Sequence, residues 1–326
     1  MRTMGFENRL IALSLVTIIV LTAVVVDLFD EETDTTTEYV YIEKVVDERN
    51  QLENESEGEN ETEPLNRSQV ARIATFNIKV FGKTKMSKSE IVEELVTIFE
   101  RYDLVAVQEI KDIDQEVPYQ FLDALNNNSS IEWKLVLSAR TGLQVDDQNS
   151  QEQYAYYYRS DIFSSLDNGT LYDDSTNDSF QREPLVSQFE LMDLSGNETG
   201  LHLTLINIHT KPTEAVAEME ALQDVLNWSS TQFENPHQII LGDFNADCSY
   251  ASYQDLISLS ISTSNYTWIV PDNADTTVGD SRCAYDRVVT TTNLDGRLTG
   301  TWGVDMEISS SNVSDHRPVW FDISRT

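Results

Sequence analysis

Polar side chains follow directly on an apolar, strand-like run near the middle of the chain. In QIILGDFNADCSY, residues 238–250, the run leads into Asp243, Asn245 and Asp247. One interpretation is a turn, because Asp and Asn side chains hydrogen-bond the backbone nearby. The other is a site for a metal ion or a phosphate group, because carboxylate and amide oxygens are ligands for hard cations. Taken alone, the motif fits both interpretations equally.

The same placement recurs along the chain, where eight polar residues stand at or just beyond the end of a predicted strand. They are Asn77, Glu109, His209, Asp243, Asn245, Asp286, Asp315 and His316. Each has a structural interpretation when taken singly, such as a satisfied strand-end histidine or a strand cap. Together they offer oxygen ligands for Mg²⁺ or Ca²⁺ and two imidazoles that can transfer protons near neutral pH. In a chain with four histidines, this combination indicates metal-dependent phosphoester hydrolysis.

Other chemistries have less support. No Ser-His-Asp spacing or nucleophile elbow occurs in the sequence, and two cysteines are too few for a zinc-thiolate site.

From Ser68 onward, strand-like runs alternate with helical ones. The helix predicted over 87–102 opens with Ser87 and Glu90 at capping-box spacing and places an apolar face toward the core. That face consists of Ile91, Leu95, Ile98 and Phe99. A second helix is predicted over 213–228, and strands are predicted at 72–78, 103–110, 154–160, 201–210, 239–245, 284–290 and 315–323. This order predicts one mixed α/β domain over 68–326.

The first 67 residues differ in composition from the rest of the chain. Residues 1–9 are a short flank, and residues 10–26 hold nothing more polar than serine and threonine. The apolar run predicts a signal peptide or a membrane anchor, and the lack of a clear small-residue cleavage motif favours the anchor. Residues 27–67 carry fifteen acidic and three basic residues, which predicts a disordered tether.

The cysteines and the N-x-S/T sequons of the chain are also consistent with export. In an oxidising compartment, Cys248 and Cys283 are more often a disulfide than two free thiols. N-x-S/T sequons recur from Asn54 to Asn312. We therefore expect the domain to be extracellular, either secreted or anchored to the outer face of the cell membrane through residues 10–26.

Five sequence blocks resemble the signature blocks of the endonuclease/exonuclease/phosphatase superfamily. They are ATFNI, VQEIKD, NIHTKP, LGDFNAD and SDHRP. Within it, FGKTKMS, NDSFQREP, GDFNADCSY and PDNADTT followed by CAYDR resemble the deoxyribonuclease I-like family. The resemblance extends from about residue 72 to the C-terminus and covers none of the first 67 residues.

The resemblance implies a four-layer α/β/β/α sandwich, in which two packed mixed sheets are flanked by helices and carry the active site at one edge. Asn77, Glu109 and Asp315 would hold the catalytic Mg²⁺, for which Mn²⁺ can substitute. Asp243 and Asn245 would face the scissile phosphate.

The resemblance also implies a role for each histidine. Glu152 would orient His209, and Asp286 would orient His316. One imidazole would activate water and the other would protonate the leaving 3′ oxygen, with His316 preferred as the base. The implied function is an endonuclease that acts on double-stranded DNA, as a monomer, and leaves 5′ phosphates.

Further positions follow from the same resemblance. Structural Ca²⁺ is implied at Asp275 with Thr277, and at Asp174, Asp178 and Glu183 with the Phe180 carbonyl. Candidate DNA contacts are Lys79, Lys111, Arg182 and Tyr285, and Cys248 would bridge to Cys283. The chain departs from the family at Ser150, where the family has a tyrosine that packs into the minor groove, and it lacks the family's small disulfide loop before NDSF.

Two alternatives remain at this point. The same residues suit a phospholipid or inositol-phosphate phosphoesterase of the superfamily, which a membrane anchor favours. The other alternative is a non-catalytic surface-binding module.

The chain is strongly acidic, with 56 acidic residues, 22 basic residues and a net charge of −34. Residues 1–26 contribute +1 and residues 27–67 contribute −12, which leaves −23 for residues 68–326. A domain with a net negative charge is repelled by a polyanion. Either the acidity aids solubility, or it reflects a saline exterior in which Mg²⁺ and Ca²⁺ bridge protein and phosphate.

Overall fold

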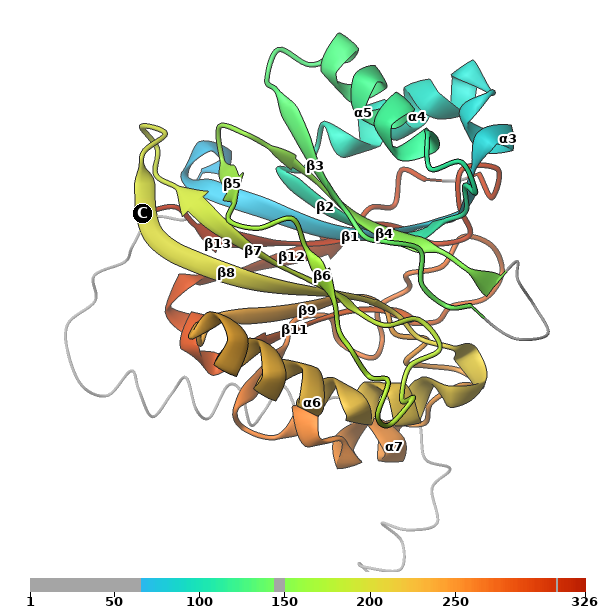
Figure 1. The fold of residues 1–326 in the computed structure, drawn as a ribbon, viewed down its shortest axis with the longest axis vertical. Helices are drawn as coiled ribbons and strands as arrows, with labels where there is room; N and C mark the ends of the chain where they lie inside the picture. Colours follow the sequence, from blue (N-terminus) through green and yellow to red (C-terminus); the bar gives the residue numbers. More distant parts are fainter. Residues whose placement is uncertain (1–65, 144–149, 309) are drawn as a thin grey trace, which may run out of the picture. The chain divides into compact units, whose positions relative to one another are not determined.

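Two mixed β-sheets form the centre of the computed structural model, which describes residues 66–143, 150–308 and 310–326 (Figure 1). The six-stranded sheet has the order β12 (Leu298–Val304), β13 (Val319–Ser324), β1 (Val70–Phe81), β2 (Leu104–Ile110), β4 (Gln153–Arg159) and β3 (Trp133–Leu137). The seven-stranded sheet has the order β10 (Tyr266–Trp268), β11 (Asp286–Thr291), β9 (Gln238–Asp243), β8 (Glu198–His209), β7 (Leu185–Met192) and β5 (Phe163–Ser165), with β6 (Thr170–Leu171) paired to β7.

One parallel pair in each sheet determines which strand ends meet. β1 and β2 run parallel, with Ile73 opposite Leu104, and α4 (Ser89–Phe99) lies in the connection between them. β8 and β9 also run parallel, with His209 opposite Asp243, and α6 (Ala215–Phe233) lies in their connection. Parallel strands end at the same edge of a sheet. Polar residues that follow these strands are therefore neighbours.

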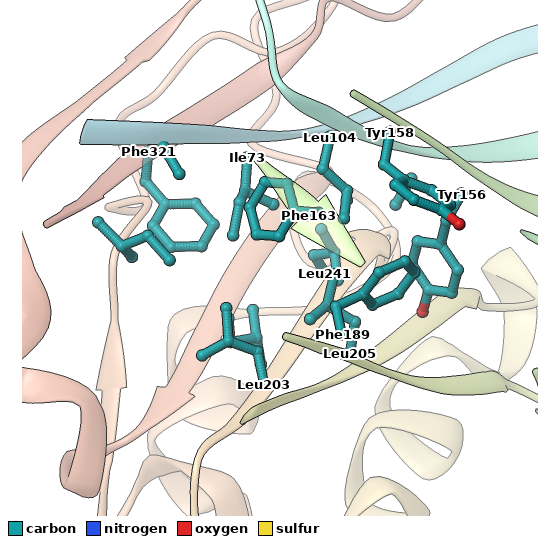
Figure 2. Close-up of a cluster of buried hydrophobic side chains, with 14 of the residues drawn as sticks. Ile73, Leu104, Tyr156, Tyr158, Phe163, Phe189, Leu203, Leu205, Leu241 and Phe321 are labelled. Atoms are coloured by element: carbon teal, nitrogen blue, oxygen red, sulfur yellow. The ribbon is translucent and has the colours of Figure 1, made fainter. Parts of the chain in front are cut away.

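Apolar side chains from both sheets interdigitate to form the central core (Figure 2). Ile73 and Leu104 enter it from the six-stranded sheet, and Leu205 and Leu241 enter it from the seven-stranded sheet. The ring of Phe189 packs edge-on against two tyrosine rings of β4, with centroid distances of 5.4 and 5.3 Å. This buried layer holds the two sheets face to face.

Helices cover the outer face of each sheet (Figure 1). On the six-stranded sheet these are α4 and α5 (Val117–Asn128), whose Phe99 and Phe121 rings meet edge to face at 4.9 Å. On the seven-stranded sheet they are α6 and α7 (Tyr253–Ser258), which bury Leu222 and Leu256. The four-layer α/β/β/α sandwich that the family resemblance implies is therefore confirmed.

The first predicted helix has its apolar face as expected but a different start. Ile91, Leu95, Ile98 and Phe99 are all buried. The capping-box prediction is wrong, because the residue before the helix is Lys88, whose side chain makes no capping hydrogen bond. The hydroxyl of Ser87 instead donates to the Thr84 carbonyl, at the end of the short helix α3 (Lys83–Met86).

The predicted segments 1–9 and 10–26, and residues 27–65 of the predicted tether 27–67, lie outside the described residues. At the end of the predicted tether, Asn66 caps a 3-10 turn, η1 (Arg67–Gln69), and an Arg67 guanidinium nitrogen lies 2.7 Å from the buried Asp103 carboxylate. Residues 66 and 67 thus pack with the domain. Within the described ranges, no helix is both long and apolar enough to cross a membrane.

Candidate active site

The strand ends bring the predicted polar residues to one edge of the sandwich. Asn77 lies on β1 and Glu109 on β2, while His209 and Asp243 end β8 and β9. Asp286 begins β11 directly opposite Asp243. The two sheets are joined at this edge, because the Asn77 side-chain amide donates to the Asp243 carboxylate at 3.0 Å. Asp315 and His316 stand in the connection from β12 to β13.

Two histidine–carboxylate pairs converge on one buried acid. His209 Nδ1 lies 2.9 Å from Glu152, and His316 Nδ1 lies 2.9 Å from Asp286. The other ring nitrogen of each histidine, Nε2, lies 3.5 Å from the same oxygen of Asp243. The two imidazoles therefore flank Asp243, each held by its own carboxylate. Such an arrangement can accept a proton on one side and donate a proton on the other.

The charges of this cluster are strongly coupled. Burial opposes ionisation of Glu152, but His209 and the nearby cations outweigh it and lower the pKa of Glu152 to about 2. Burial would also lower the pKa of His316, yet Asp286 and Asp243 raise it to about 10. Burial raises the pKa of Asp286. Despite its own burial, Asp243 has a lowered pKa, because both imidazoles and the Asn77 amide favour its ionised form.

The residues predicted to hold Mg²⁺ offer hard oxygen donors at the same edge. The Asn77 amide nitrogen donates to Glu109 Oε1 at 3.1 Å, so this amide and this carboxylate are in direct contact. The Asp315 carboxylate lies 2.5 Å from the ammonium of Lys79, and the Lys111 ammonium lies 4.0 Å from Glu109. Two carboxylates and an amide oxygen are suitable ligands for a divalent metal such as Mg²⁺. The two lysine ammonium groups beside these carboxylates show that the set attracts positive charge.

The four predicted DNA contacts have different environments. Lys79 and Lys111 are partly exposed and face site carboxylates. Tyr285 is partly buried, with its ring 6.2 Å from that of His316. Arg182 is only 6% exposed, and its guanidinium donates to the carbonyls of His209 and Thr210 and to Glu152. The donors of Arg182 are therefore used within the protein, where they support the His209–Glu152 pair.

The residues predicted to bind Ca²⁺ are held mainly by protein hydrogen bonds. Asp174 accepts from the Phe180 amide at 2.8 Å, Glu183 accepts from the Thr141 hydroxyl, and Asp275 accepts from the Thr277 hydroxyl at 3.0 Å. Asp178 has a left-handed backbone with φ of 49°. None of these acids belongs to a group of three ligand atoms within 4.8 Å of one another in the described part of the chain.

A disulfide joins Cys248 to Cys283, with Cα atoms 5.9 Å apart, as the resemblance implied. Next to it, the Asp247 carboxylate accepts a hydrogen bond from the Ala284 amide at 2.7 Å. These two links fasten the segment after Asn245 to the segment that leads into Asp286. They therefore connect two loops of the site.

Arg287 supports the same two loops and was not predicted from the sequence. Its side chain is fully buried and donates to the carbonyls of Ala284, Val270 and Ala246 at 2.8 to 3.0 Å, while pairing with Asp272. The available signal was a basic residue directly after Asp286 in the predicted strand AYDRVVT. A buried arginine needs several acceptors, which marks a position where loops meet.

Comparisons with known proteins agree with this geometry. A sequence profile of the Endonuclease/Exonuclease/phosphatase family matches residues 74–316. Deoxyribonuclease-1 of Bos taurus and that of Homo sapiens are each 34% identical over 265 residues, which span 76% of this chain and 90% of each relative. A solved endonuclease/exonuclease/phosphatase from Bacteroides vulgatus has a TM-score of 0.53 at 15% identity, and covers 78% of this chain and 98% of its own.

Proposed function

Because the chain belongs to the Endonuclease/Exonuclease/phosphatase family, we propose that it is a divalent-metal-dependent endonuclease that hydrolyses phosphodiester bonds of duplex DNA. The observation that carries this proposal is the pair of histidines, His209 and His316, which both face Asp243 beside a set of hard oxygen donors. The relatives named deoxyribonuclease support DNA as the substrate.

The two imidazoles supply the two proton transfers of hydrolysis. One takes a proton from the attacking water, and the other gives a proton to the leaving 3′ oxygen, so the product carries a 5′ phosphate. Asp286 and Asp243 raise the pKa of His316 to about 10, so its ring holds a proton near neutral pH. We therefore assign proton donation to His316 and proton acceptance to His209, the reverse of the preference drawn from the sequence.

The remaining residues orient these groups and hold charge. Glu152 and Asp286 fix the rings through Nδ1, which leaves each Nε2 facing Asp243, where the scissile phosphate would bind. Asn245, whose amide nitrogen donates to the Thr210 carbonyl at 3.1 Å, is held beside Asp243. A divalent cation bound by Asn77, Glu109 and Asp315 would stabilise negative charge on the phosphoryl oxygens.

We also propose that the enzyme works outside the cell as a monomer, with residues 10–26 as its anchor or as a removed signal. The disulfide and the secretory-type N-terminus support export. Protease treatment of intact cells tests the anchored form. Loss of the domain from the cell surface is expected, whereas a protected domain would contradict an outward orientation.

Plasmid nicking tests the proposed activity. Supercoiled DNA incubated with the full-length chain and Mg²⁺ should become nicked circles, and chelation should stop the reaction. DNA ligase should reseal the nicks without a kinase, because resealing requires a 5′ phosphate and a 3′ hydroxyl. Release of phosphate from inositol phosphates or phospholipid vesicles without nicking would establish the alternative phosphoesterase. DNA binding with no hydrolysis of any substrate would establish a binding module.

A further inference from the structure

One lysine ammonium is enclosed by backbone carbonyls directly behind the predicted metal-binding residues. Lys85 Nζ donates to the carbonyls of Ile78, Lys79 and Val313, at 2.5, 2.6 and 2.5 Å. An ammonium has three donors, so all of them are used. Lys85 belongs to the short helix α3, and it contacts the end of β1 just before this helix and the loop before β13, which is distant in sequence.

The three carbonyls belong to the two segments that carry metal-binding residues. Ile78 and Lys79 directly follow Asn77, while Val313 stands two residues before Asp315. A second bond joins the same segments, because the Ser314 hydroxyl donates to the Asn77 carbonyl at 2.6 Å. Lys85 therefore connects the strand that supplies Asn77 to the loop that supplies Asp315.

The backbone that Lys85 contacts has an unusual conformation. Lys79 and Val80 have φ of 39° and 52°, in the left-handed region that a β-branched residue such as valine rarely adopts. This turn interrupts the pairing of β1 with β2. Such a conformation persists only where surrounding contacts enforce it.

The turn has its amides directed toward the metal-binding side chains. The Lys79 amide donates to Asn77 Oδ1 and the Val80 amide donates to Glu109 Oε2, both at 2.9 Å. The Lys79 carbonyl and the Ile78 carbonyl before it accept hydrogen bonds from the ammonium of Lys85. The turn thus lies between Lys85 and the oxygen donors, and its shape determines where those donors point.

The lysines on either side of Lys85 in the sequence do not make such contacts. Lys83, two residues earlier, pairs with the exposed Asp114, and the side chain of Lys88 has no hydrogen bond or ion pair within the described residues. Of these three lysines, Lys85 alone contacts the backbone of the site.

We propose that Lys85 is a positioning residue for the metal-binding set. Its ammonium holds the left-handed Lys79–Val80 turn against the 313–316 loop and so fixes Asn77, Glu109 and Asp315 relative to one another before a cation binds. This inference rests on the proposed function only in naming that set as metal ligands.

The test replaces Lys85 by a residue of similar length without charge and uses a neighbouring lysine as the control. K85M should raise the Mg²⁺ concentration for half-maximal plasmid nicking at least about tenfold, while the rate at saturating Mg²⁺ stays within about threefold of wild type. K88M should leave both values unchanged. Calorimetric titration with Mn²⁺, which needs no DNA, should show the same weakening for K85M.

Hydrogen exchange of the metal-free protein gives a readout independent of activity. In K85M, a peptide covering 77–82 should exchange faster, because the Lys79 and Val80 amides lose their fixed acceptors, while a peptide within α6 should not change. If wild-type protein fails to nick DNA, the proposed function fails, but this comparison still tests the role of Lys85. Unchanged exchange and unchanged Mn²⁺ affinity in folded K85M would overturn the inference.

A second substitution keeps the test valid if K85M folds poorly. Glycine adopts positive φ without strain, so V80G should stabilise the turn directly. The double variant K85M/V80G should fold and recover most of the lost Mn²⁺ affinity. If the double variant folds but has the same weak affinity as K85M, the turn is not the link between Lys85 and the metal ligands, and the inference is refuted.

Discussion

Salt should affect this enzyme differently from ordinary DNA-binding proteins. Proteins that bind DNA through lysine and arginine lose affinity as salt rises, because their cations displace counterions from the phosphates. Residues 68–326 carry a net charge of −23. The perturbation is a rise in NaCl from roughly 50 to 500 mM at saturating Mg²⁺, a range over which the screening length shortens severalfold.

Most lysines and arginines of the described residues are already paired within the protein. Among the lysines and arginines of the described residues, only Lys88 and Arg282 have side chains without a hydrogen bond or ion pair to another described residue. Lys79 and Lys111, at the site, already face carboxylates.

The expected size of the salt effect follows from the net number of phosphate contacts. Each net phosphate contact contributes about −0.9 to the slope of log affinity against log salt, so a tenfold rise in salt costs about eightfold per contact. A lysine that leaves a carboxylate in order to bind a phosphate adds little to the net number of phosphate contacts. At the site, where Lys79 and Lys111 make this exchange, we expect less than one net contact, offset by screening of the long-range repulsion, so kcat/KM should stay flat or rise.

Initial rates of plasmid nicking, with circular dichroism to verify folding at each salt concentration, measure this dependence. A monotonic loss of tenfold or more while the domain remains folded would refute the reasoning. It would show that a local basic surface around Lys79 and Lys111 governs binding.

Three further predictions concern the site and its supports. Asp286→Asn removes one of the three carboxylates, those of Asp286, Asp243 and Asp315, that raise the pKa of His316 from 6.5 to about 10. The alkaline limb of the kcat/KM profile should therefore fall by roughly one to two pH units. An unmoved limb would contradict proton donation by His316. The pKa of Glu152 is depressed from 4.5 to about 2, so its contribution to the free energy of unfolding is complete above pH 4.5 and is lost as the pH falls through about 2. Urea unfolding of the wild type should show about 3 kcal/mol of pH-dependent stability in this window that Glu152→Gln lacks. The same dependence of unfolding free energy on pH in both proteins would disprove it. Reduction of the Cys248–Cys283 bond, which spans 35 residues, should lower stability by about 3 to 4 kcal/mol, measured as a drop in Tm, and an unchanged Tm would disagree.

Strand ends were the part of the site that the sequence could predict. Asn77, Glu109, His209 and Asp243 follow apolar runs, and parallel pairing brings such ends together. The partner of each histidine followed from family resemblance. Glu152, for example, stands directly before β4, where periodicity alone identifies no function.

Contacts to backbone carbonyls account for what sequence reasoning missed. The contact of Arg182 with DNA stays a prediction, but its hydrogen bonds to the carbonyls of His209 and Thr210 were not predicted, because carbonyl directions depend on the finished fold. The same applies to Lys85 and Arg287. The start of α4 at Ser89, after Lys88, has a similar cause, because Ser87 is used by the preceding helix.

Replacement of the histidines one at a time tests the central claim most directly. The chain has four, and His202 and His237 lie toward the opposite ends of β8 and β9, so H202A and H237A are matched controls. H209A and H316A should each slow Mg²⁺-dependent nicking by about 10²-fold or more while the domain stays folded by circular dichroism, because each removes one proton transfer, while both controls stay near wild type. Near wild-type nicking by folded H209A or H316A would contradict the assignment of this edge as the active site.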